Sequence, residues 1–516
     1  MTDRAQGIFE LLIRSRAAEH PDSTWLLWED EEVSWATALS AIQRVANGLL
    51  GLGIRPGDRI ALMMGNKPEF LWAHFAAGFI GASTVPVNIS QRGPALSHIL
   101  ADSGAACAIV DDELRDVVSA VRKEAAGLAH AVVVGGKAGD GFETDFDHLL
   151  DGDDREPSID VTEAPTGAAM LYTSGTTGPP KGVVQKGAAA GASGFLPLIS
   201  SLGIQPGETI YTALPLFHGN ALLISTTGSM VLDARLALGR RFSASRLFDE
   251  TRKYGAVEFN ALGGMITILL KQPPRDDDRD NPVRVVLSAG CPAERWVEFE
   301  ERFGVKLVEF YGLVDAPGLL LNDSGRVGSM GRPIGECEFA VMSDGGELLG
   351  SDEVGEVVFK HPAGQLSEYH NLPEATESAW RDGWFHTGDL AARDVEGFYY
   401  YKGRKKESIR RLGENISAWE IETVANQHPK VLESAAHAVP SELGEDEVKL
   451  CVVEKPGESV DPVELGSFLE GRVARYAVPR YIEIMAEIPK TPTHRVRYQE
   501  LKDRGVTTQT WDRTTA

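Results

Sequence analysis

The stretch of this sequence with the most evident chemical purpose is residues 171–184, which read LYTSGTTGPPKGVV. Six consecutive Thr, Ser or Gly residues occupy positions 173–178, and a lysine follows shortly after them. Glycines let the backbone approach a ligand, and successive N–H groups in such a loop form a concave site for anions. Hydroxyl groups add donors, and a lysine adds a positive charge. We therefore predict that phosphate is held by Thr173, Ser174, Gly175, Thr176, Thr177 and Lys181.

This loop differs from the phosphate loop of the common nucleoside triphosphatases, whose motif requires Gly-Lys followed by Ser or Thr. Here Gly178 is followed by Pro-Pro-Lys-Gly. A polar turn between two elements is the structural alternative, but a turn requires neither so many hydroxyl groups nor a lysine beside them. The pattern therefore favours phosphate binding by another type of loop.

Polar side chains also follow several short apolar runs that are predicted as strands. These stretches are PLFHGN at 215–220, SAGCP at 288–292 and EFYGLVD at 309–315. Because ligands bind at the carboxyl ends of the strands in open α/β sheets, we expect them near the phosphate loop. Two later stretches, DGWFHTGDL at 382–390 and YKGR at 401–404, carry an aspartate and an arginine. Each His, Tyr or Asp taken singly is more often structural, so function is inferred from the combination.

The elements that position these stretches alternate between helix and strand. Residues 36–52 have apolar side chains at helical spacing, which predicts an amphipathic helix. Pro68 suits the first turn of a second helix, which is expected to end near residue 81. Such alternation predicts a doubly wound parallel sheet, and the pattern repeats after an acidic linker at residues 150–166. Predicted strands lie at 59–64, 84–87, 106–110, 131–134, 168–171, 210–214, 256–262, 283–287 and 306–311.

The last part of the chain has a different texture. Residues 325–401 contain many glycines and short β-like runs, which predict a small barrel or sheet module. A basic run at residues 402–412 precedes a capping box at 417–420, and helix and strand candidates then continue as a small α+β domain. The polar tail after Arg504 is expected to be loose.

Composition restricts the class of protein. A chain of 516 residues is too long for one core, so two or more domains are expected. The formal net charge of -24 disfavours a nucleic-acid partner or an anionic membrane surface. Four scattered cysteines without a CxxC pair predict neither a zinc site nor a disulfide framework. The sequence contains no signal-peptide core and no apolar run approaching the ~20 residues of a membrane span, so a cytoplasmic location is expected.

In combination these motifs resemble those of the adenylate-forming superfamily, which includes acyl-CoA synthetases, peptide-synthetase adenylation domains and luciferases. The resemblance covers residues 35–501 and is greatest to the carnitine/crotonobetaine-CoA ligase type. It implies two reactions: a carboxylic acid and ATP give an acyl-adenylate and pyrophosphate, and a thiol then gives a thioester and AMP. CoA is the preferred thiol, and a carrier-protein thiol is the alternative.

The resemblance also implies the architecture. It predicts a large N-terminal domain at residues 1–402, with two doubly wound α/β subdomains and a small β-barrel. A hinge at 403–406 contains Lys406, and a small mobile α+β domain follows at 407–516. After domain rotation, Leu412 and Gly413 would border the CoA tunnel, because glycine leaves room for the pantetheine arm.

Roles for individual residues follow from the same resemblance. Tyr311 would stack on adenine, with Gly290 and Cys291 in the loop that contacts the purine edge. Asp389 would accept hydrogen bonds from the ribose hydroxyls, and Arg404 would be a second ribose contact. His218 would lie beside the acyl group. Small residues leave volume, so a bulky, mostly apolar carboxylic acid is predicted in a pocket lined by Gly219, Gly263, Gly264, Ala316 and Gly318.

Several positions depart from the family pattern. After Tyr-Gly the family has any residue, then Thr to contact the α-phosphate and Glu to hold magnesium. This chain has Val314, which lacks the hydroxyl, and Asp315, a shorter carboxylate that is the candidate Mg²⁺ ligand. The family's Gly-Lys is replaced by His494 and Arg495. That lysine bridges carboxylate and phosphate during adenylation, and removing such a group costs about 3–4 kcal/mol. Arg495 keeps the charge but is planar and forked.

Because the departures cluster where adenylation occurs, three functions stay open. The preferred hypothesis is a ligase whose adenylation is weak or lost, so that it mainly transfers an acyl group from acyl-AMP to CoA, with a separate adenylating enzyme as partner. A complete two-step acyl-CoA synthetase using ATP, CoA and Mg²⁺ is the first alternative, and a stand-alone enzyme that loads a carrier protein is a variant of it. A non-catalytic adenylate-binding protein is the second.

Overall fold

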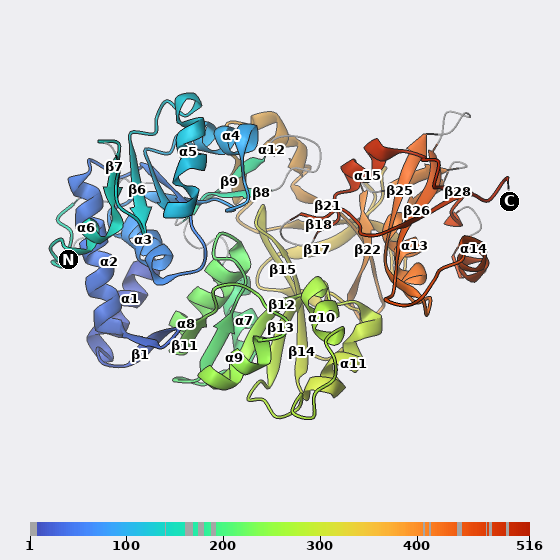
Figure 1. Ribbon diagram of the computed structural model, residues 1–516, viewed down its shortest axis with the longest axis horizontal. Coiled ribbons are helices and arrows are strands. Elements are labelled where there is room, and N and C mark those ends of the chain that lie inside the picture. The colour runs from blue at the N-terminus through green and yellow to red at the C-terminus, as the bar shows by residue number, and fades with distance from the viewer. Residues whose placement is uncertain are drawn as a thin grey trace. The chain divides into compact units, whose positions relative to one another are not determined.

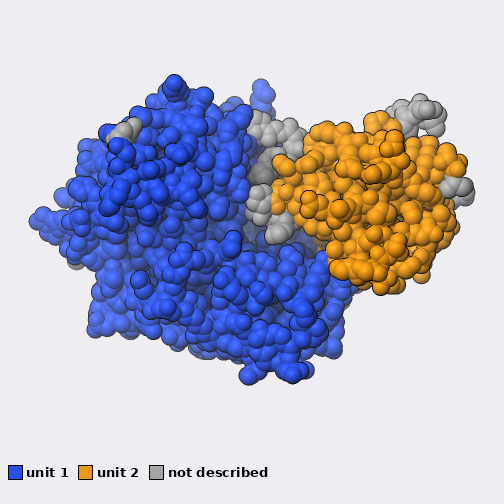
Figure 2. All heavy atoms as spheres, in the orientation of Figure 1, with its two compact units in different colours: residues 1–338, 359–385 blue, residues 339–358, 386–516 orange. Residues whose placement is uncertain are grey.

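In the computed structural model the chain packs into two units (Figure 2). Unit 1 consists of Met1–Glu338 and Phe359–Phe385, and unit 2 consists of Phe339–Val358 and His386–Ala516. A hinge at residues 403–406 stays a prediction. The structure describes residues 8–139, 141–159, 169–173, 180–186, 192–405, 408–411, 414–440, 446–470, 472–473, 477–491 and 495–515.

The first part of unit 1 is built on a parallel five-stranded sheet, as the alternation of strand and helix predicts. Its order is β4 (Ser83–Pro86), β3 (Arg59–Met63), β5 (Cys107–Asp111), β6 (His130–Val134) and β7 (Glu143–Asp145). The helix predicted at residues 36–52 is α2, which begins after Ser34 accepts a hydrogen bond from the Thr37 N–H. The helices here are α1 (Ile8–Glu19), α2 (Trp35–Gly51), α3 (Pro68–Phe79), α4 (Gly93–Ser103), α5 (Arg115–Val121) and α6 (Phe146–Leu150), with 3₁₀ turns η1 (Asp112–Leu114) and η2 (Arg122–Glu124).

The second part of unit 1 is a nine-stranded sheet that is parallel in its centre and antiparallel at both edges. Its order is β16 (Arg332–Ile334), β15 (Ala316–Asn322), β14 (Lys306–Leu313), β13 (Val285–Ala289), β12 (Ala256–Leu262), β10 (Thr209–Thr212), β11 (Arg235–Leu238), β1 (Thr24–Trp28) and β2 (Glu31–Ser34). Figure 1 labels its strands β12, β13 and β14. Its helices are α7 (Ala192–Ser200), the π-helix η3 (Asn220–Thr226), α8 (Thr227–Leu232), α9 (Leu247–Tyr254), α10 (Gly263–Leu270) and α11 (Ala293–Phe303). One core cluster includes Leu62 of the first sheet and Leu236 of the second.

A smaller sheet carries the two ends of the predicted phosphate loop. β8 (Leu171–Thr173) pairs with β9 (Lys181–Gln185), and β9 also pairs with β19 (Ser367–Tyr369), with both pairs antiparallel. Helix α12 (Pro373–Ala379) follows β19. The strands that flank the loop therefore form a β-hairpin, which places Thr173 opposite Lys181.

The β-rich module predicted for residues 325–401 forms a five-stranded sheet. Its strands are β17 (Glu338–Met342), β18 (Val354–Lys360), β21 (Trp384–Arg393), β20 (Trp380–Arg381) and β22 (Tyr399–Arg404). The last strand, β22, pairs antiparallel with β21. This hairpin brings the predicted ribose contacts together.

The remainder of unit 2 has the predicted α+β character. Strands β23 (Ser408–Arg411) and β24 (Glu414–Ser417) form one hairpin. The main sheet has the order β25 (Val431–Pro440), β26 (Asp446–Glu454), β27 (Tyr481–Met485) and β28 (Trp511–Asp512). The helices are α13 (Ala418–Ala425), α14 (Pro462–Leu469) and α15 (Tyr498–Arg504).

The prediction of a loose tail after Arg504 is wrong. β28 pairs with β27, and Asp512 accepts a hydrogen bond of 3.1 Å from Arg480. Thr510 donates to Glu483, whose side chain is 0% exposed beside that of Lys449. The tail is therefore held because it completes the surroundings of a buried ion pair.

The four cysteines are free and buried. Their spacing in the sequence does not predict a disulfide framework. Among the described helices, none combines the length and apolar character needed to cross a membrane.

Candidate active site

Neighbouring parallel strands place several predicted residues of unit 1 along one edge of the nine-stranded sheet. His218 and Gly219 follow β10, Gly263 follows β12, and Gly290 follows β13. Tyr311 lies near the end of β14. His218 is exposed, whereas Tyr311 is half-buried. The order of the strands therefore gathers stretches that are far apart in sequence, as expected at the carboxyl edge of an α/β sheet.

Two glycines at this edge allow close approach between segments. A Cβ at Gly263 would lie 1.8 Å from the carbonyl oxygen of Gly290, and a Cβ at Gly219 would lie 3.1 Å from Cγ1 of Val314. Neighbouring atoms thus occupy the space that small residues were expected to leave. The assignment to an acyl pocket stays a prediction for Gly219, Gly263, Gly264, Ala316 and Gly318, of which the last two lie buried in β15.

A buried carboxyl group that sequence reasoning missed fixes the loop after β13. Glu309 in β14 is 4% exposed and accepts hydrogen bonds from the N–H groups of Gly290 and Cys291. Burial raises the pKa of Glu309 to about 7, although these hydrogen bonds act in the opposite direction. Gly290 has φ of 81°, a conformation that favours glycine. Glu309 therefore holds the loop predicted to contact the purine. Its position two residues before Tyr311 was the available signal.

The phosphate-loop lysine faces a tyrosine from a distant strand. Lys181 places its Nζ 4.6 Å from the ring centroid of Tyr369, a cation–π contact. The Tyr369 hydroxyl donates a 2.7 Å hydrogen bond to Oδ1 of Asp315. Burial, together with the Asp315 charge, raises the pKa of Tyr369. The hydroxyl therefore stays a donor at neutral pH, and Lys181, Tyr369 and Asp315 form a chain of contacts.

The backbone around Asp315 is held by side chains of the same small sheet. Ser367 donates through its hydroxyl to the Asp315 carbonyl oxygen. Gln185 donates to the Val314 carbonyl oxygen over 2.9 Å. The two positions that depart from the family pattern thus lie against β9 and β19, the strands beside the phosphate loop. Nothing local in the sequence indicates Ser367 or Tyr369, because β19 joins this sheet from far along the chain.

Several predicted site residues lie outside the described part of the chain. They are Ser174, Gly175, Thr176 and Thr177 of the phosphate loop, Lys406 of the hinge, and Leu412 and Gly413 of the predicted CoA tunnel.

In unit 2, the predicted ribose contacts face each other across a hairpin. Asp389 of β21 is in register with Arg404 of β22, and Nε of Arg404 lies 2.9 Å from Oδ1 of Asp389. Asp389 is 2% exposed. A buried carboxylate beside a guanidinium presents acceptors and donors suited to vicinal hydroxyl groups.

A second polar cluster lies beside this pair and directly precedes the predicted hinge residue. Lys405 contacts Asp344 over 2.8 Å and Glu356 over 3.2 Å. Glu356 also lies 3.1 Å from Nδ1 of His386 and accepts the Gly388 N–H over 3.0 Å. Burial acts to raise the pKa of Glu356, but these hydrogen bonds and the lysine charge hold it below its usual value. The cluster anchors the end of β22 to its own sheet.

The backbone of Arg495 is held by two hydrogen bonds to Thr491. The Thr491 N–H donates to the Arg495 carbonyl oxygen over 2.7 Å, and the Arg495 N–H donates to the Thr491 hydroxyl over 3.1 Å. Lys490 pairs with Glu433 of β25. Arg495 is exposed, so its cation lies at the surface while its backbone is held by Thr491. His494 lies outside the described residues.

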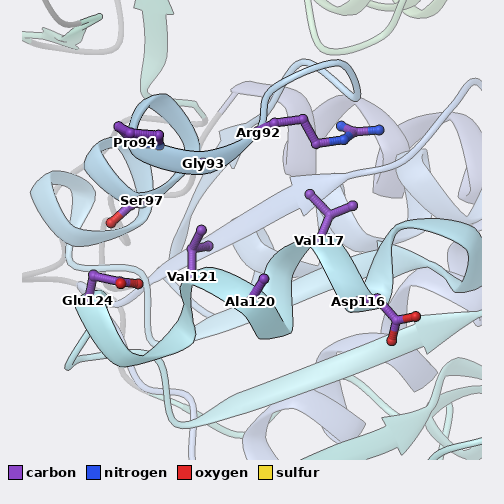
Figure 3. Close-up of a pocket in the computed structure, with 9 residues that line it drawn as sticks. All are labelled: Arg92, Gly93, Pro94, Ser97, Asp116, Val117, Ala120, Val121 and Glu124. Atoms are coloured by element: carbon purple, nitrogen blue, oxygen red, sulfur yellow. The ribbon is translucent and has the colours of Figure 1, made fainter.

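A surface groove in unit 1 is separate from these positions. It lies between α4 and α5, and the residues that line it are Arg92, Gly93, Pro94, Ser97, Asp116, Val117, Ala120, Val121 and Glu124 (Figure 3). It contains none of the predicted site residues.

Comparisons with known proteins agree with this arrangement. The family model "AMP-binding enzyme" matches residues 13–370, and "AMP-binding enzyme C-terminal domain" matches residues 420–495. A crotonobetaine/carnitine–CoA ligase of Salmonella paratyphi B is 29% identical over 513 residues, covering 94% of this chain and 97% of that protein.

Solved structures extend the likeness. The o-succinylbenzoate–CoA synthetase of Bacillus subtilis, in complex with its acyl-adenylate intermediate, has 26% identity and a TM-score of 0.81, with coverage of 95% and 98%. A fatty acyl-CoA synthetase of Mycobacterium tuberculosis has 27% identity and a TM-score of 0.75, with coverage of 98% and 99%.

These matches define the chain as a member of the AMP-binding enzyme family, the adenylate-forming enzymes that its motifs resemble. It is an acid–thiol ligase.

Proposed function

We propose that this enzyme converts a carboxylic acid into its CoA thioester through an acyl-adenylate, and that adenylation is the weaker half-reaction. The similarity to a crotonobetaine/carnitine–CoA ligase and an o-succinylbenzoate–CoA synthetase supports the overall reaction. One observation supports the weaker adenylation. The carboxylate of Asp315 accepts a hydrogen bond from the Tyr369 hydroxyl, so not all of its oxygen lone pairs are available to a metal. That carboxylate is also one methylene shorter than the family's glutamate.

Asp315 fits a magnesium ion bound together with ATP. Mg²⁺ in nucleotide sites takes one or two carboxylates, and substrate phosphates and water supply its other ligands. A carboxylate in contact with Tyr369, which faces the phosphate-loop lysine, meets that requirement. When bound, the ion neutralises charge on the phosphate oxygens. The Tyr369 hydrogen bond competes for Asp315, so a functional but weakened site is expected.

Other residues would hold the nucleotide during both half-reactions. Tyr311 would stack on the adenine beside the loop that Glu309 fixes. Asp389 and Arg404 would bind the ribose, which has to share or rearrange their ion pair. Lys181 would contact phosphate from the start of β9. These residues are intact, which is why an acyl-adenylate is expected to bind well.

Arg495 would stabilise the negative charge that develops between the carboxylate and the α-phosphate. It supplies the charge of the family's lysine through a planar fork, so the alignment of its donors differs. His218 is proposed to lie beside the acyl group, where its exposed position leaves the imidazole accessible. CoA, rather than a carrier-protein thiol, is the proposed acceptor.

A complete two-step synthetase is the second candidate. It is favoured by the retained cation at position 495 and by the carboxylate at position 315, which is linked to the phosphate-loop lysine through Tyr369. In that case no separate adenylating enzyme is needed.

Two parallel reactions distinguish these candidates by mass spectrometry. One contains free acids, ATP, Mg²⁺ and CoA, and the other contains synthetic acyl-adenylates and CoA. We expect acyl-CoA in both, with much faster formation from the adenylate. Equal rates would identify a complete synthetase, and formation from the adenylate alone would mean that adenylation is lost.

Restoring the family residues tests the same proposal. Arg495→Lys, and the pair Val314→Thr with Asp315→Glu, should each raise adenylation about tenfold or more, since one preorganised group contributes 10²–10³-fold. The rate from preformed adenylate should stay unchanged. Arg497→Lys is the matched control. Arg497 lies two residues after Arg495, is exposed and pairs with Glu500. An unchanged adenylation rate in both variants would refute a weakened first half-reaction.

A further inference from the structure

Two amide side chains meet at the edge of the nine-stranded sheet that carries His218. Asn260, at the carboxyl end of β12, donates a hydrogen bond from Nδ2 to Oδ1 of Asn220, which begins η3. Asn260 is 2% exposed, and Asn220 is half-buried. Asn220 is the last residue of the PLFHGN stretch, but neither it nor Asn260 was assigned a role from the sequence.

The two amides have hydrogen-bonding capacity left over. Each carries one carbonyl oxygen and one NH₂ group, and the contact between them uses one of each. Within the described chain, this contact is the only hydrogen bond of the Asn260 and Asn220 side chains. Whichever way the amides are oriented, one acceptor oxygen and one NH₂ donor remain. Buried amides usually have partners, so this pair is suited to a ligand group that can both donate and accept.

The surroundings of the pair include apolar side chains and a buried carboxyl group with a raised pKa. A Cβ at Gly219, the residue before Asn220, would meet side-chain carbons of Val314, Leu171 and Leu223 within 3.6 Å. On β12 the side chain of Glu258 points to the same face as that of Asn260, because alternate residues share a face. Burial raises the pKa of Glu258 well above its usual value, which disfavours the charged form of this carboxyl group. A negative charge on β12 beside the amide pair is therefore disfavoured.

We propose that the acid activated by this enzyme carries a neutral hydrogen-bonding group, such as a hydroxyl, keto or amide group, which binds Asn220 and Asn260. The apolar part of the acid lies between this group and the carboxylate. The inference rests on the proposed acyl-CoA ligase function and refines the mostly apolar acid expected from the sequence. A substrate group at this place would replace water at two amide groups, and an acid without it would leave them unpaired.

The test compares acids of matched length in the acyl-CoA assay. The panel contains unsubstituted butanoate, hexanoate and octanoate, their hydroxy and keto derivatives, phenylpropanoate with its ring-hydroxylated form, adipate and 4-(trimethylammonio)butanoate. Each is supplied both as free acid with ATP and, except for 4-(trimethylammonio)butanoate and adipate, as synthetic adenylate. At the preferred length we expect kcat/KM for a hydroxy or keto acid to exceed that of the unsubstituted acid by tenfold or more.

Variants assign the preference to the amide pair. Asn220→Ala and Asn260→Leu should each reduce the preference to threefold or less while the unsubstituted acid is still converted. Asn260→Ser, a smaller polar replacement, provides a second variant if Asn260→Leu does not fold. Asn371→Ala is the control, because its exposed amide lies in a turn and contacts Asp102 over 3.2 Å. It should leave the preference unchanged.

The possible outcomes are distinct. A preference for unsubstituted acids, for adipate or for 4-(trimethylammonio)butanoate, which has a charged group but no hydroxyl, overturns the inference but leaves the ligase function standing. A polar preference that survives in both Asn220→Ala and Asn260→Leu overturns the role of this pair. Absence of any acyl-CoA, from the free acids and from the adenylates, overturns the proposed function and the inference with it.

Discussion

Two glutamates with completely buried side chains, one in each unit, differ in their surroundings. Glu258 in β12 of unit 1 is 0% exposed and has no cationic partner within the described chain. Glu483 in β27 of unit 2 is also 0% exposed, but Lys449, Arg504 and Thr510 all donate to its carboxylate. Burial raises the pKa of Glu258 well above its usual value.

The pKa of Glu483 shifts in the opposite direction. Burial acts to raise its pKa, but the hydrogen bonds and charges of Lys449, Thr510 and Arg504 lower it below the usual value. Equal exposure is thus accompanied by a raised pKa in one unit and a lowered pKa in the other. The partners of a buried acid, rather than its burial alone, decide its charge. In unit 1 the buried acid is Glu258 in β12, the strand that precedes Gly263. In unit 2 the buried acid is Glu483, which accepts a hydrogen bond from Thr510 and so holds the last segment of the unit.

The largest expected effect comes from removing the partner of Glu483. Lys449→Met leaves a buried carboxylate without its lysine and should destabilise the protein by about 3–5 kcal/mol. This change in the free energy of unfolding is measured by unfolding in guanidinium, monitored with a spectroscopic signal that comes from unit 2. The double variant Lys449→Met with Glu483→Leu should recover most of the loss, and a single variant as stable as the parent would contradict a strong pair.

Replacing Glu258 should have the opposite sign. The folded pKa of this acid is raised, so its contribution to stability is complete below its unfolded pKa and is lost as the pH rises through the folded value. Glu258→Gln removes that loss and is expected to be stabilising by about 1–3 kcal/mol at pH 8, and by less at pH 5. Thermal unfolding at both pH values measures the difference. A destabilised variant at pH 8 would show that the ionised group has an unrecognised partner.

Glu309 lies between these extremes, because its pKa is raised only to about 7. Its contribution to stability should fall by about 1 kcal/mol between pH 6 and pH 8, since the folded group loses its proton in that range. Glu309→Gln keeps an acceptor for the Gly290 N–H and should remove this slope. Adenylate affinity should follow the same curve in the parent protein. A parent and variant with parallel pH profiles would contradict the assignment.

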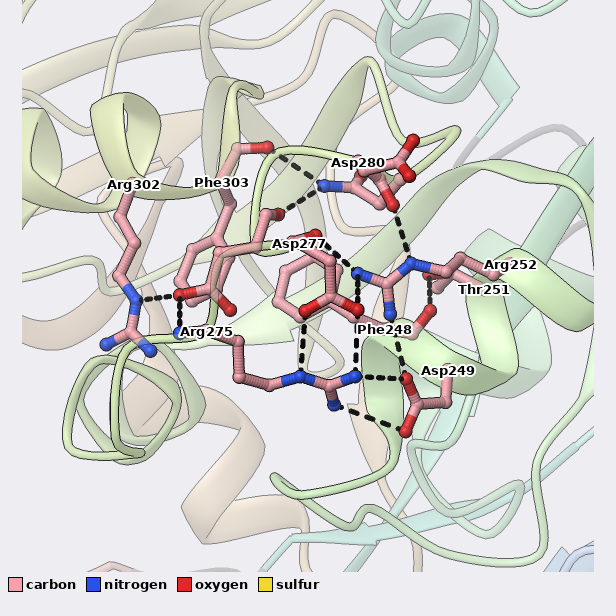
Figure 4. A network of polar contacts seen from close by, with 11 residues as sticks. Phe248, Asp249, Thr251, Arg252, Arg275, Asp277, Asp280, Arg302 and Phe303 are labelled. Atoms are coloured by element: carbon pink, nitrogen blue, oxygen red, sulfur yellow. Dashed lines mark hydrogen bonds and ion pairs between the residues drawn. The ribbon is translucent and has the colours of Figure 1, made fainter.

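The smallest effect is expected for an exposed network in unit 1. Arg275 contacts Asp249 and Asp277 through its guanidinium, and Arg252 joins the same carboxylates (Figure 4). Exposed ion pairs contribute little because water and salt screen them. Arg275→Ala should leave the unfolding midpoint unchanged within error in 150 mM salt. A clear shift would mean that this network is coupled to the core.

Local periodicity and motifs were sufficient to predict the elements of unit 1 that carry the candidate site. Helix α2, the parallel strands and the carboxyl-edge position of His218 and Gly290 are all determined by apolar patterns and strand order. The family of the chain was also correctly predicted from the combination of motifs.

Contacts between distant segments could not be predicted in this way. Tyr369 reaches Asp315 because β19 pairs with β9, and no local pattern indicates that pairing. Glutamates within strands, such as Glu258 and Glu309, look like ordinary polar positions until burial and partners are known. The tail was wrongly expected to be loose, because its polar residues have their partners in β27 and near Lys449.

The four buried cysteines can serve as natural probes of local opening of the protein. A thiol reagent can modify each of them only when the surrounding structure opens, and burial raises the pKa of every one of these thiols. Cys107, Cys291 and Cys337 lie in unit 1, whereas Cys451 lies in β26 of unit 2. The order in which mass spectrometry detects labelled cysteines would therefore give separate opening rates for the two units, without any introduced probe.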